Sequence, residues 1–231
     1  MLSIKGVHSA YGETTILRDV GIEIGKGQVI ALMGRNGVGK TTLLKTVMGL
    51  VQPFSGSITL DGEEMRGLPP ESRARKGIGY VPQGRDIFPH LTVRENLVLG
   101  LEARGKKAGT IPKGVFDLFP RLRDLLPRKG GDLSGGQQQQ LAIARVLITE
   151  PRLLLMDEPT EGIQPSIVFE IENTIRLIKA QGTVSILLVE QFMEFALRLA
   201  DYCYIMEKGA ITFQGEVAGL SREEIKGRLA I

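Results

Sequence analysis

The chain has 231 residues, of which 42% are hydrophobic and 24% charged, and its formal net charge is +3. This composition is ordinary for a globular protein able to bury a core, and the length suits one large domain or one domain with a substantial insertion. The basic residues are scattered, so we expect no nucleic-acid partner. The single cysteine, Cys203, excludes a disulfide framework and predicts a small buried side chain.

Strand-like and helix-like segments alternate along the first part of the chain. Four segments have the apolar or alternating pattern of strands: 21–24, 28–33, 55–65 and 78–82. The third contains the turn signal Asp61-Gly62, which predicts a hairpin-like reversal. Residues 41–50 have helical periodicity and reach Gly49, a typical helix end. A glycine-rich turn joins this helix to the strand before it.

Residues 93–148 have a different sequence pattern, because segments with helical periodicity follow one another there with no strand-like segment between them. The helical segments are VRENLVLGLEA, GVFDLFPRLRDLL and QQLAIARVLI, with a loose linker at 105–114. Strand and helix patterns then alternate again from 152 to 216. We therefore predict a single α/β domain over 1–231, with a mainly parallel sheet and an antiparallel β portion in 1–92 and 149–231. Residues 93–148 are predicted to form a helical subdomain.

The segment GRNGVGKTT, residues 34–42, matches the pattern G-x-x-x-x-G-K-[ST] between a strand and a helix. In this context the pattern predicts a P-loop, whose backbone N–H groups and helix N-terminus bind phosphate. Lys40 is expected to reach the β- and γ-phosphates of ATP, and the Thr41 hydroxyl to bind Mg²⁺. The predicted nucleotide contacts are Gly34, Arg35, Asn36, Gly37, Val38, Gly39, Lys40, Thr41 and Thr42.

A second motif, RLLLMDEP at 152–159, is an apolar strand that ends in two carboxylates. Ligands bind at the carboxyl ends of strands in open α/β sheets, so this end is expected to face the P-loop. We expect Asp157 to hold Mg²⁺ and Glu158 to polarise the attacking water. A helix start before Pro159 would be the alternative, and the P-loop makes it the weaker one.

The stretch DLSGGQQQQ, residues 132–140, would alone predict a loop and the polar first turn of a helix. With the P-loop before it and LLLMDE after it, the chain resembles the ATP-binding-cassette (ABC) ATPases over its whole length, and LSGGQ is that family's signature. The resemblance implies that Ser134, Gly135, Gly136 and Gln137 complete the nucleotide site of a second ATPase subunit, either identical or different. Residues 138–140 are expected at the surface.

Further positions match the family's pattern. Tyr11 stands where the family stacks an aromatic ring on adenine, and Gln83 corresponds to a glutamine that approaches Mg²⁺ and the attacking water. Phe88, Pro89 and Leu91 are candidates for contact with a membrane subunit, or for packing under the helical subdomain. The sequence departs from the pattern at two sites. Gln164 replaces a common aspartate, and Gln191 replaces the switch histidine that senses the γ-phosphate.

The segments YVPQGRDIFPHLTVRENL, GGDLSGGQQQQLAIAR and DEPTEGIQPSI most resemble the ATPase subunits of urea importers, within the branched-chain amino-acid importer type. This resemblance implies membrane permease subunits as partners, fed by a periplasmic binding protein. The chain lacks a signal-peptide pattern and an apolar run of membrane-spanning length, so we expect it at the cytoplasmic membrane face through its partners. The ATPase subunit of a branched-chain amino-acid importer, or of another amide importer, is the alternative. The single cassette disfavours a translation factor, and the short insertion before the signature disfavours a chromosome ATPase. The LSGGQ signature disfavours a P-loop kinase.

Overall fold

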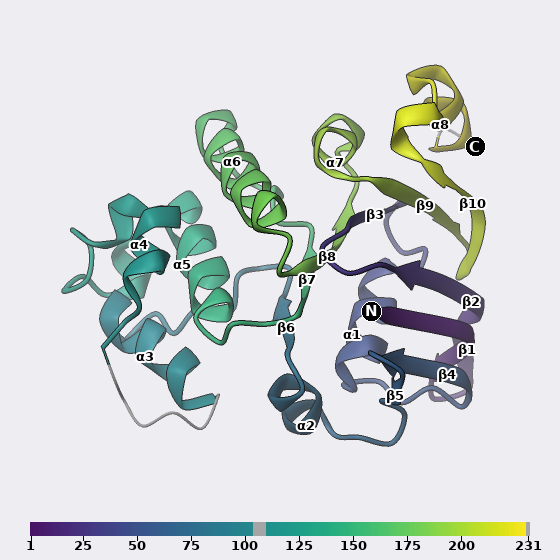
Figure 1. Cartoon of the computed structure of the whole chain (residues 1–231), viewed down its shortest axis with the longest axis horizontal. Coiled ribbons are helices and arrows are strands. Elements are labelled where there is room, and N and C mark those ends of the chain that lie inside the picture. Colours follow the sequence, from purple (N-terminus) through teal and green to yellow (C-terminus); the bar gives the residue numbers. More distant parts are fainter. Residues whose placement is uncertain (104–109, 230–231) are drawn as a thin grey trace.

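The computed structural model describes residues 1–103 and 110–229, which form two β-sheets flanked by helices (Figure 1). The larger sheet has six strands in the order β10-β9-β3-β8-β7-β6. Every neighbouring pair runs parallel except β9 with β10, which confirms the predicted mainly parallel sheet. Its strands are β3 (Val29–Met33), β6 (Ile78–Val81), β7 (Leu153–Asp157), β8 (Ser185–Glu190), β9 (Tyr202–Glu207) and β10 (Ala210–Glu216).

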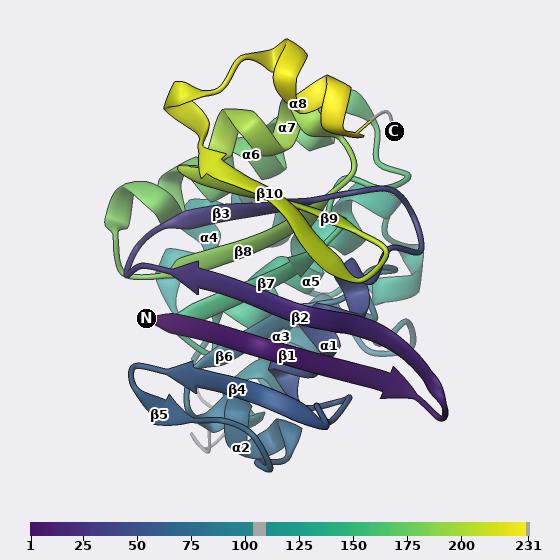
Figure 2. The same cartoon turned by 90° about the vertical axis from the view of Figure 1, so that its right-hand side faces the viewer.

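The smaller sheet is antiparallel, in the order β2-β1-β4-β5, and Figure 2 shows β1 between β2 and β4. The strand predicted at 21–24 is the end of a longer strand, because β1 offers it pairing partners from Thr14 onward. Asp61 and Gly62 have positive φ angles of 51° and 82° and form the predicted turn. The strands are β1 (Leu2–Tyr11), β2 (Thr14–Ile24), β4 (Ser55–Leu60) and β5 (Glu63–Glu64).

The central strand β3 contributes side chains to two hydrophobic cores. Val29, Ala31 and Met33 belong to the core with α6 (Pro165–Gln181) and α7 (Met193–Leu199), whereas Ile30 and Leu32 belong to the core with α1 (Lys40–Met48) and the antiparallel sheet. Successive side chains of a strand point to opposite faces, so an uninterrupted apolar strand must be covered on both faces. Cys203 on β9 is buried as predicted.

The segment between β6 and β7 is helical, and Figure 1 shows α3, α4 and α5 together at the end of the molecule away from β1 and β2. The predicted helix through 114–126 is wrong beyond Leu118. Pro120 has no N–H to donate and disfavours a helical Phe119, whose φ is −131°. Residues 105–109 of the predicted linker lie outside the described residues. The elements are α3 (Val93–Ala103), α4 (Lys113–Leu118), η1 (Pro120–Leu122), η2 (Gly130–Asp132) and α5 (Gly135–Leu147).

The remaining described elements are short. They are α2 (Pro70–Arg75), η3 (Val217–Gly219) and α8 (Arg222–Leu229). Within residues 1–103 and 110–229, no helix has the length and apolar character needed to cross a bilayer. The parallel strands β3, β6, β7 and β8 share one orientation, so the loops that follow them meet at the same edge of the sheet. That edge carries the predicted site.

Candidate nucleotide-binding and hydrolysis site

The P-loop leaves β3 and returns as α1 in a backbone path that requires glycine. A Cβ on Gly34 would lie 2.4 Å from the backbone oxygen of Met206, closer than real contacts allow. Gly39 immediately precedes α1 with a φ of 114°, a conformation that other residues rarely adopt. The sequence predicted glycines that free the backbone for phosphate. The structure adds that Gly34 is also needed for packing against β9.

Lys40 is buried at the base of this loop, with an exposed fraction of 4%. Its Nζ donates to the backbone oxygens of Gly34 at 2.8 Å and Arg35 at 3.0 Å, and it lies 3.4 Å from Oε1 of Glu158. The backbone oxygens of the loop therefore orient the ammonium group, and a carboxylate lies beside it. A cation held in this way can exchange these partners for the oxygens of a phosphate.

Asp157 ends the fully buried strand β7 and meets two hydroxyl groups. Thr41 Oγ1 donates to its Oδ1 at 3.1 Å, and the Tyr80 hydroxyl donates to its Oδ2 at 3.3 Å. Burial raises the pKa of Asp157, an effect that these two hydrogen bonds oppose. Tyr80 was missed from the sequence. Its signal was a phenol on the strand beside β7, since Tyr80 pairs in register with Leu155.

Glu158 turns the chain immediately after β7, with a positive φ of 45° that is uncommon outside glycine. Its backbone N–H donates to the oxygen of Val189 at 2.9 Å, which fixes the turn against β8. Two amide side chains contact its carboxylate: Gln191 Nε2 lies 3.2 and 3.3 Å from its two oxygens, and Gln83 Nε2 lies 3.5 Å from Oε2. The structure thus brings both predicted glutamines to the predicted base.

Two other groups hold these glutamines. Gln83 donates to Oε2 of Glu161 at 2.8 Å, and Gln191 donates to Oδ1 of Asn36 in the P-loop. Gln191 therefore joins the loop after β8 to the loop after β3. This arrangement places a neutral donor at the position expected of the family's switch histidine.

Glu190 is a second residue that the sequence analysis missed. It is 2% exposed and accepts from Thr160 Oγ1 at 2.8 Å, and from the backbone N–H groups of Thr160 and Phe192 at 3.2 and 3.3 Å. Burial raises the pKa of Glu190, and these hydrogen bonds oppose that shift. The residue fastens the loop after Glu158 to the loop after Gln191. An acidic residue at the end of an apolar strand was the available signal.

A cavity of about 360 Å³ opens above the P-loop. It is lined by Ile16, Asn36, Gly37, Gly39, Lys40, Thr41, Thr42, Gln83 and Glu158. Tyr11 does not line it. Tyr11 is 49% exposed at the end of β1, on the same hairpin that supplies Ile16. The structure thus brings most of the predicted phosphate-binding residues together around this cavity. Tyr11 lies outside the cavity, and its stacking on adenine stays a prediction.

The donor set suits a magnesium ion. Thr41, Asp157 and Gln83 offer a hydroxyl, a carboxylate and an amide oxygen, the hard ligands that Mg²⁺ prefers alongside phosphate and water. In the described part of the chain, no group of three or more His, Cys, Asp or Glu is placed to hold a metal ion. Mg²⁺ shared with a nucleotide needs no such group, because phosphate and water supply its other ligands.

The signature residues lie at the start of α5 and do not line this cavity. Ser134 caps the helix: its Oγ accepts from the Gln137 N–H at 3.3 Å, and the Gln137 side chain accepts from the Ser134 N–H at 3.0 Å. A Cβ on Gly136 would lie 2.6 Å from Cγ2 of Ile167 on α6. Gly136 is therefore required for helix packing as well as being a predicted phosphate contact.

The expectation that Gln138 to Gln140 lie at the surface is wrong for two of them. Gln139 and Gln140 are each 4% exposed. Gln140 donates to Glu170 on α6, and Gln138 donates to the backbone oxygen of Gly130 at 3.2 Å. A polar run suggested a solvated face, but α5 packs against α6 along its first turns, and such packing is not visible in composition.

Comparison with known proteins decides the family. The model of the ABC transporter family matches residues 17–161, more than half of the chain. The chain belongs to the ABC transporter family. This cassette is 43% identical over 221 residues to the high-affinity branched-chain amino acid transport ATP-binding protein BraG of Pseudomonas aeruginosa, covering 95% of this chain and 94% of that protein. It is 37% identical over 225 residues to the probable branched-chain amino acid transport ATP-binding protein LivF of Archaeoglobus fulgidus, covering 97% and 95%.

Solved structures confirm the fold of the cassette. A nucleotide-free ATP-binding cassette from an ABC transporter superposes with a TM-score of 0.85 at 28% identity, covering 100% of this chain and 95% of that one. A dimeric bacterial ABC transporter cassette gives a TM-score of 0.82 at 26% identity, covering 95% and 100%. The chain is an ABC transporter ATPase with the predicted α/β fold, mainly parallel sheet and antiparallel β portion.

Proposed function

We propose that the cassette is the ATP-hydrolysing subunit of an ABC importer for branched-chain amino acids. The observation that carries this proposal is the assembled site around Glu158 in a chain similar over nearly its full length to BraG and LivF. The two names describe branched-chain amino acid transport, and they favour the amino-acid alternative over urea. Urea import remains a second candidate on the segments quoted above from 80–97, 130–145 and 157–167.

In the proposed reaction the P-loop N–H groups and Lys40 bind the phosphates of ATP. Thr41, Asp157 and Gln83 would hold Mg²⁺, which neutralises phosphate charge when bound. Glu158 accepts a proton from the attacking water, because it is the carboxylate that borders the cavity. Gln191 orients that carboxylate through its amide and remains neutral throughout.

The signature residues act in a second cassette. Ser134 caps α5 at its exposed end, so the helix N-terminus with its partial positive charge is free to meet an anion from another chain. A related cassette, 25% identical with a TM-score of 0.84, is described as a dimer bound to ADP and Pi in a post-hydrolysis state. We therefore propose that Ser134, Gly135, Gly136 and Gln137 complete the nucleotide site of the opposite subunit.

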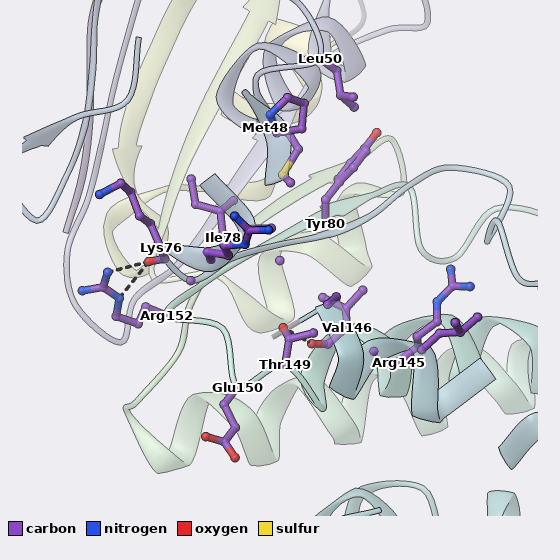
Figure 3. Close-up of a pocket in the computed structure, with 18 of the residues that line it drawn as sticks. Met48, Leu50, Lys76, Ile78, Tyr80, Arg145, Val146, Thr149, Glu150 and Arg152 are labelled. Atoms are coloured by element: carbon purple, nitrogen blue, oxygen red, sulfur yellow. Dashed lines mark hydrogen bonds between the residues drawn. The ribbon is translucent and has the colours of Figure 1, made fainter. Parts of the chain in front are cut away.

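A groove of about 690 Å³ is proposed as the docking site of the membrane subunit. Its lining residues come from several elements, with Met48, Ile78 and Val146 supplying apolar surface (Figure 3). Arg145 forms one side and stacks over Phe88 at 5.1 Å. Phe88, predicted as a membrane-subunit contact, lines the groove and is 48% exposed. Arg75, Lys76 and Glu150 also line the groove, and an apolar floor with charged walls suits an amphipathic helix.

Tyr80 connects this groove to the nucleotide site. Its ring lines the groove, while its hydroxyl donates to Asp157 at 3.3 Å. A partner docked in the groove would thus contact Tyr80, whose hydroxyl is hydrogen-bonded to the predicted metal ligand Asp157. This placement supports the view that a peripheral subunit at the cytoplasmic membrane face couples hydrolysis to transport.

Uptake by intact cells tests the cargo. A strain lacking the gene should lose high-affinity uptake of labelled leucine, isoleucine or valine, and the intact gene should restore it. Glu158→Gln serves as the matched control, because it should be made and assembled without supporting uptake. Loss of urea uptake with normal leucine uptake would overturn the amino-acid proposal in favour of urea. Loss of neither would overturn both.

A further inference from the structure

The glutamine run after the signature makes a contact that nucleotide binding does not explain. Gln140 is 4% exposed, and its Nε2 donates to Oε2 of Glu170 on α6 at 2.6 Å. The other oxygen of the same carboxylate lies 3.2 Å from Nη2 of Arg121 in η1. One carboxylate on α6 therefore receives two groups from the helical segment between β6 and β7.

A second contact lies one turn nearer the start of both helices. Gly136 meets Ile167 so closely that a Cβ on Gly136 would lie 2.6 Å from Cγ2 of Ile167. Gly136 and Gln140 are four residues apart on α5, and Ile167 and Glu170 are three apart on α6, so each pair shares a helix face. The first turns of α5 and α6 therefore abut along one line.

Further along, α5 and α6 share one hydrophobic core, to which Leu141 of α5 and Ile171 of α6 contribute, but this packing is interrupted on one side of the line. A cavity of about 360 Å³ lies beside the Gln140–Glu170 contact, with Asp117, Asn173 and Leu177 in its lining. Next to an open cavity, few side-chain contacts oppose relative movement. The hydrogen bond between Gln140 and Glu170 joins the helices there, and a charge-assisted bond between a buried amide and a half-buried carboxylate is stronger than a neutral one.

We propose that Gln140 and Glu170 are positioning residues that lock the signature helix α5 to α6. The signature residue Ser134 directly precedes α5, and Gln164 directly precedes α6. The lock makes these two helix starts move as one unit when two cassettes meet around ATP. This inference rests on the proposed function, in which the signature acts on the nucleotide of the second cassette.

The test uses a charge swap with a matched control. Gln140→Glu puts two carboxylates together and should lower kcat about tenfold or more, the scale of one lost charge-assisted hydrogen bond. The double variant Gln140→Glu/Glu170→Gln restores an amide–carboxylate pair and should recover most of the rate. Asn173→Glu is the control, because it adds the same charge to the lining of the same cavity without a partner in the lock.

Three measurements separate positioning from loss of structure. ATP affinity of the single chain should stay within about twofold, because the P-loop is untouched, whereas kcat should fall. Amide hydrogen exchange at residues 135–141 should accelerate in Gln140→Glu while exchange in α1 stays unchanged. Melting temperatures report folding, and Gln140→Met replaces Gln140→Glu if that variant does not fold.

Parental kcat in a folded Gln140→Glu protein would overturn the proposal, as would a swap variant that stays as slow as the single change. The proposed function has its own control in the otherwise unmodified Glu158→Gln chain. If that chain hydrolyses ATP at the parental rate, the proposed function fails. In that case, hydrogen exchange in the single chain still tests whether Gln140 and Glu170 hold α5 against α6. Unchanged exchange at residues 135–141 in Gln140→Glu would overturn the proposal.

Discussion

Replacing Gln191 by alanine removes the amide that contacts the proposed base. Gln191 Nε2 lies 3.2 and 3.3 Å from the two oxygens of Glu158. These distances exceed the usual N–H···O value of about 2.9–3.0 Å, so the contact belongs at the low end of the range for hydrogen bonds to charged groups, about 1.5 kcal/mol. Gln191→Ala should therefore lower kcat roughly tenfold. ATP affinity should change little, because Gln191 is not among the residues that line the cavity above the P-loop.

The assay is steady-state ATP hydrolysis against pH, with nucleotide affinity measured separately. Gln191→His should keep most of the activity near pH 8, where a neutral imidazole still offers one N–H donor. Its rate should fall as the pH drops through about 6.5, because a protonated histidine would pair with Glu158 and weaken it as a base. The parental rate should show no such step there. If Gln191→Ala hydrolyses ATP like the parent, the amide does not orient Glu158 and the reasoning fails.

Four further predictions concern the same site and the core. Lys40→Ala should lose most ATP affinity in equilibrium binding of labelled ATP, because a buried phosphate charge would lack its cation; near-parental affinity would contradict the P-loop role. Glu158→Gln should bind ATP normally yet slow turnover by roughly 10² or more in a single-turnover assay, the scale of a lost general base. Tyr80→Phe removes the hydroxyl that donates to Asp157 and should raise the Mg²⁺ concentration needed for nucleotide binding about threefold or more, whereas an unchanged Mg²⁺ titration would show that the bond carries no weight. Burial raises the pKa of Cys203 to about 11, so its thiol should stay protonated and resist iodoacetamide at pH 8 in the native protein, and react once urea unfolds the chain; rapid labelling without urea would contradict its burial.

The residues at the carboxyl edge of the parallel sheet were predictable because they belong to contiguous sequence motifs. GRNGVGKTT specifies a strand–loop–helix turn by itself, and an apolar strand ending in Asp157 and Glu158 can deliver them only to the carboxyl edge of the sheet. Gln83 and Gln191 followed from resemblance, and their meeting at Glu158 is explained by the parallel order of β6, β7 and β8.

Other parts of the site depend on which elements pack together, and that information is not local in the sequence. Tyr80 reaches Asp157 because β6 neighbours β7, a pairing between segments more than seventy residues apart. Gln140 looked solvated because it stands in a polar run, but α6 covers it. The helix prediction failed after Leu118 for a local reason. The prediction followed the helical spacing of apolar residues at 114–126, but Pro120 ends the helix in the structure.

The contact between Gly136 and Ile167 has a consequence for genetic work on the signature. A glycine-to-alanine change at position 136 places a methyl group 2.6 Å from Cγ2 and 2.7 Å from Cγ1 of Ile167, so it disturbs helix packing before any nucleotide is present. An inactive Gly136→Ala allele would therefore be a poor reporter of phosphate recognition. Shortening Ile167 to alanine removes both of these carbons and opens space for the methyl group, and this change should arise as a second-site suppressor of that allele. Ser134, whose side chain is exposed, is the cleaner position at which to dissect the signature genetically, provided that the replacement, such as threonine, keeps an oxygen to cap α5.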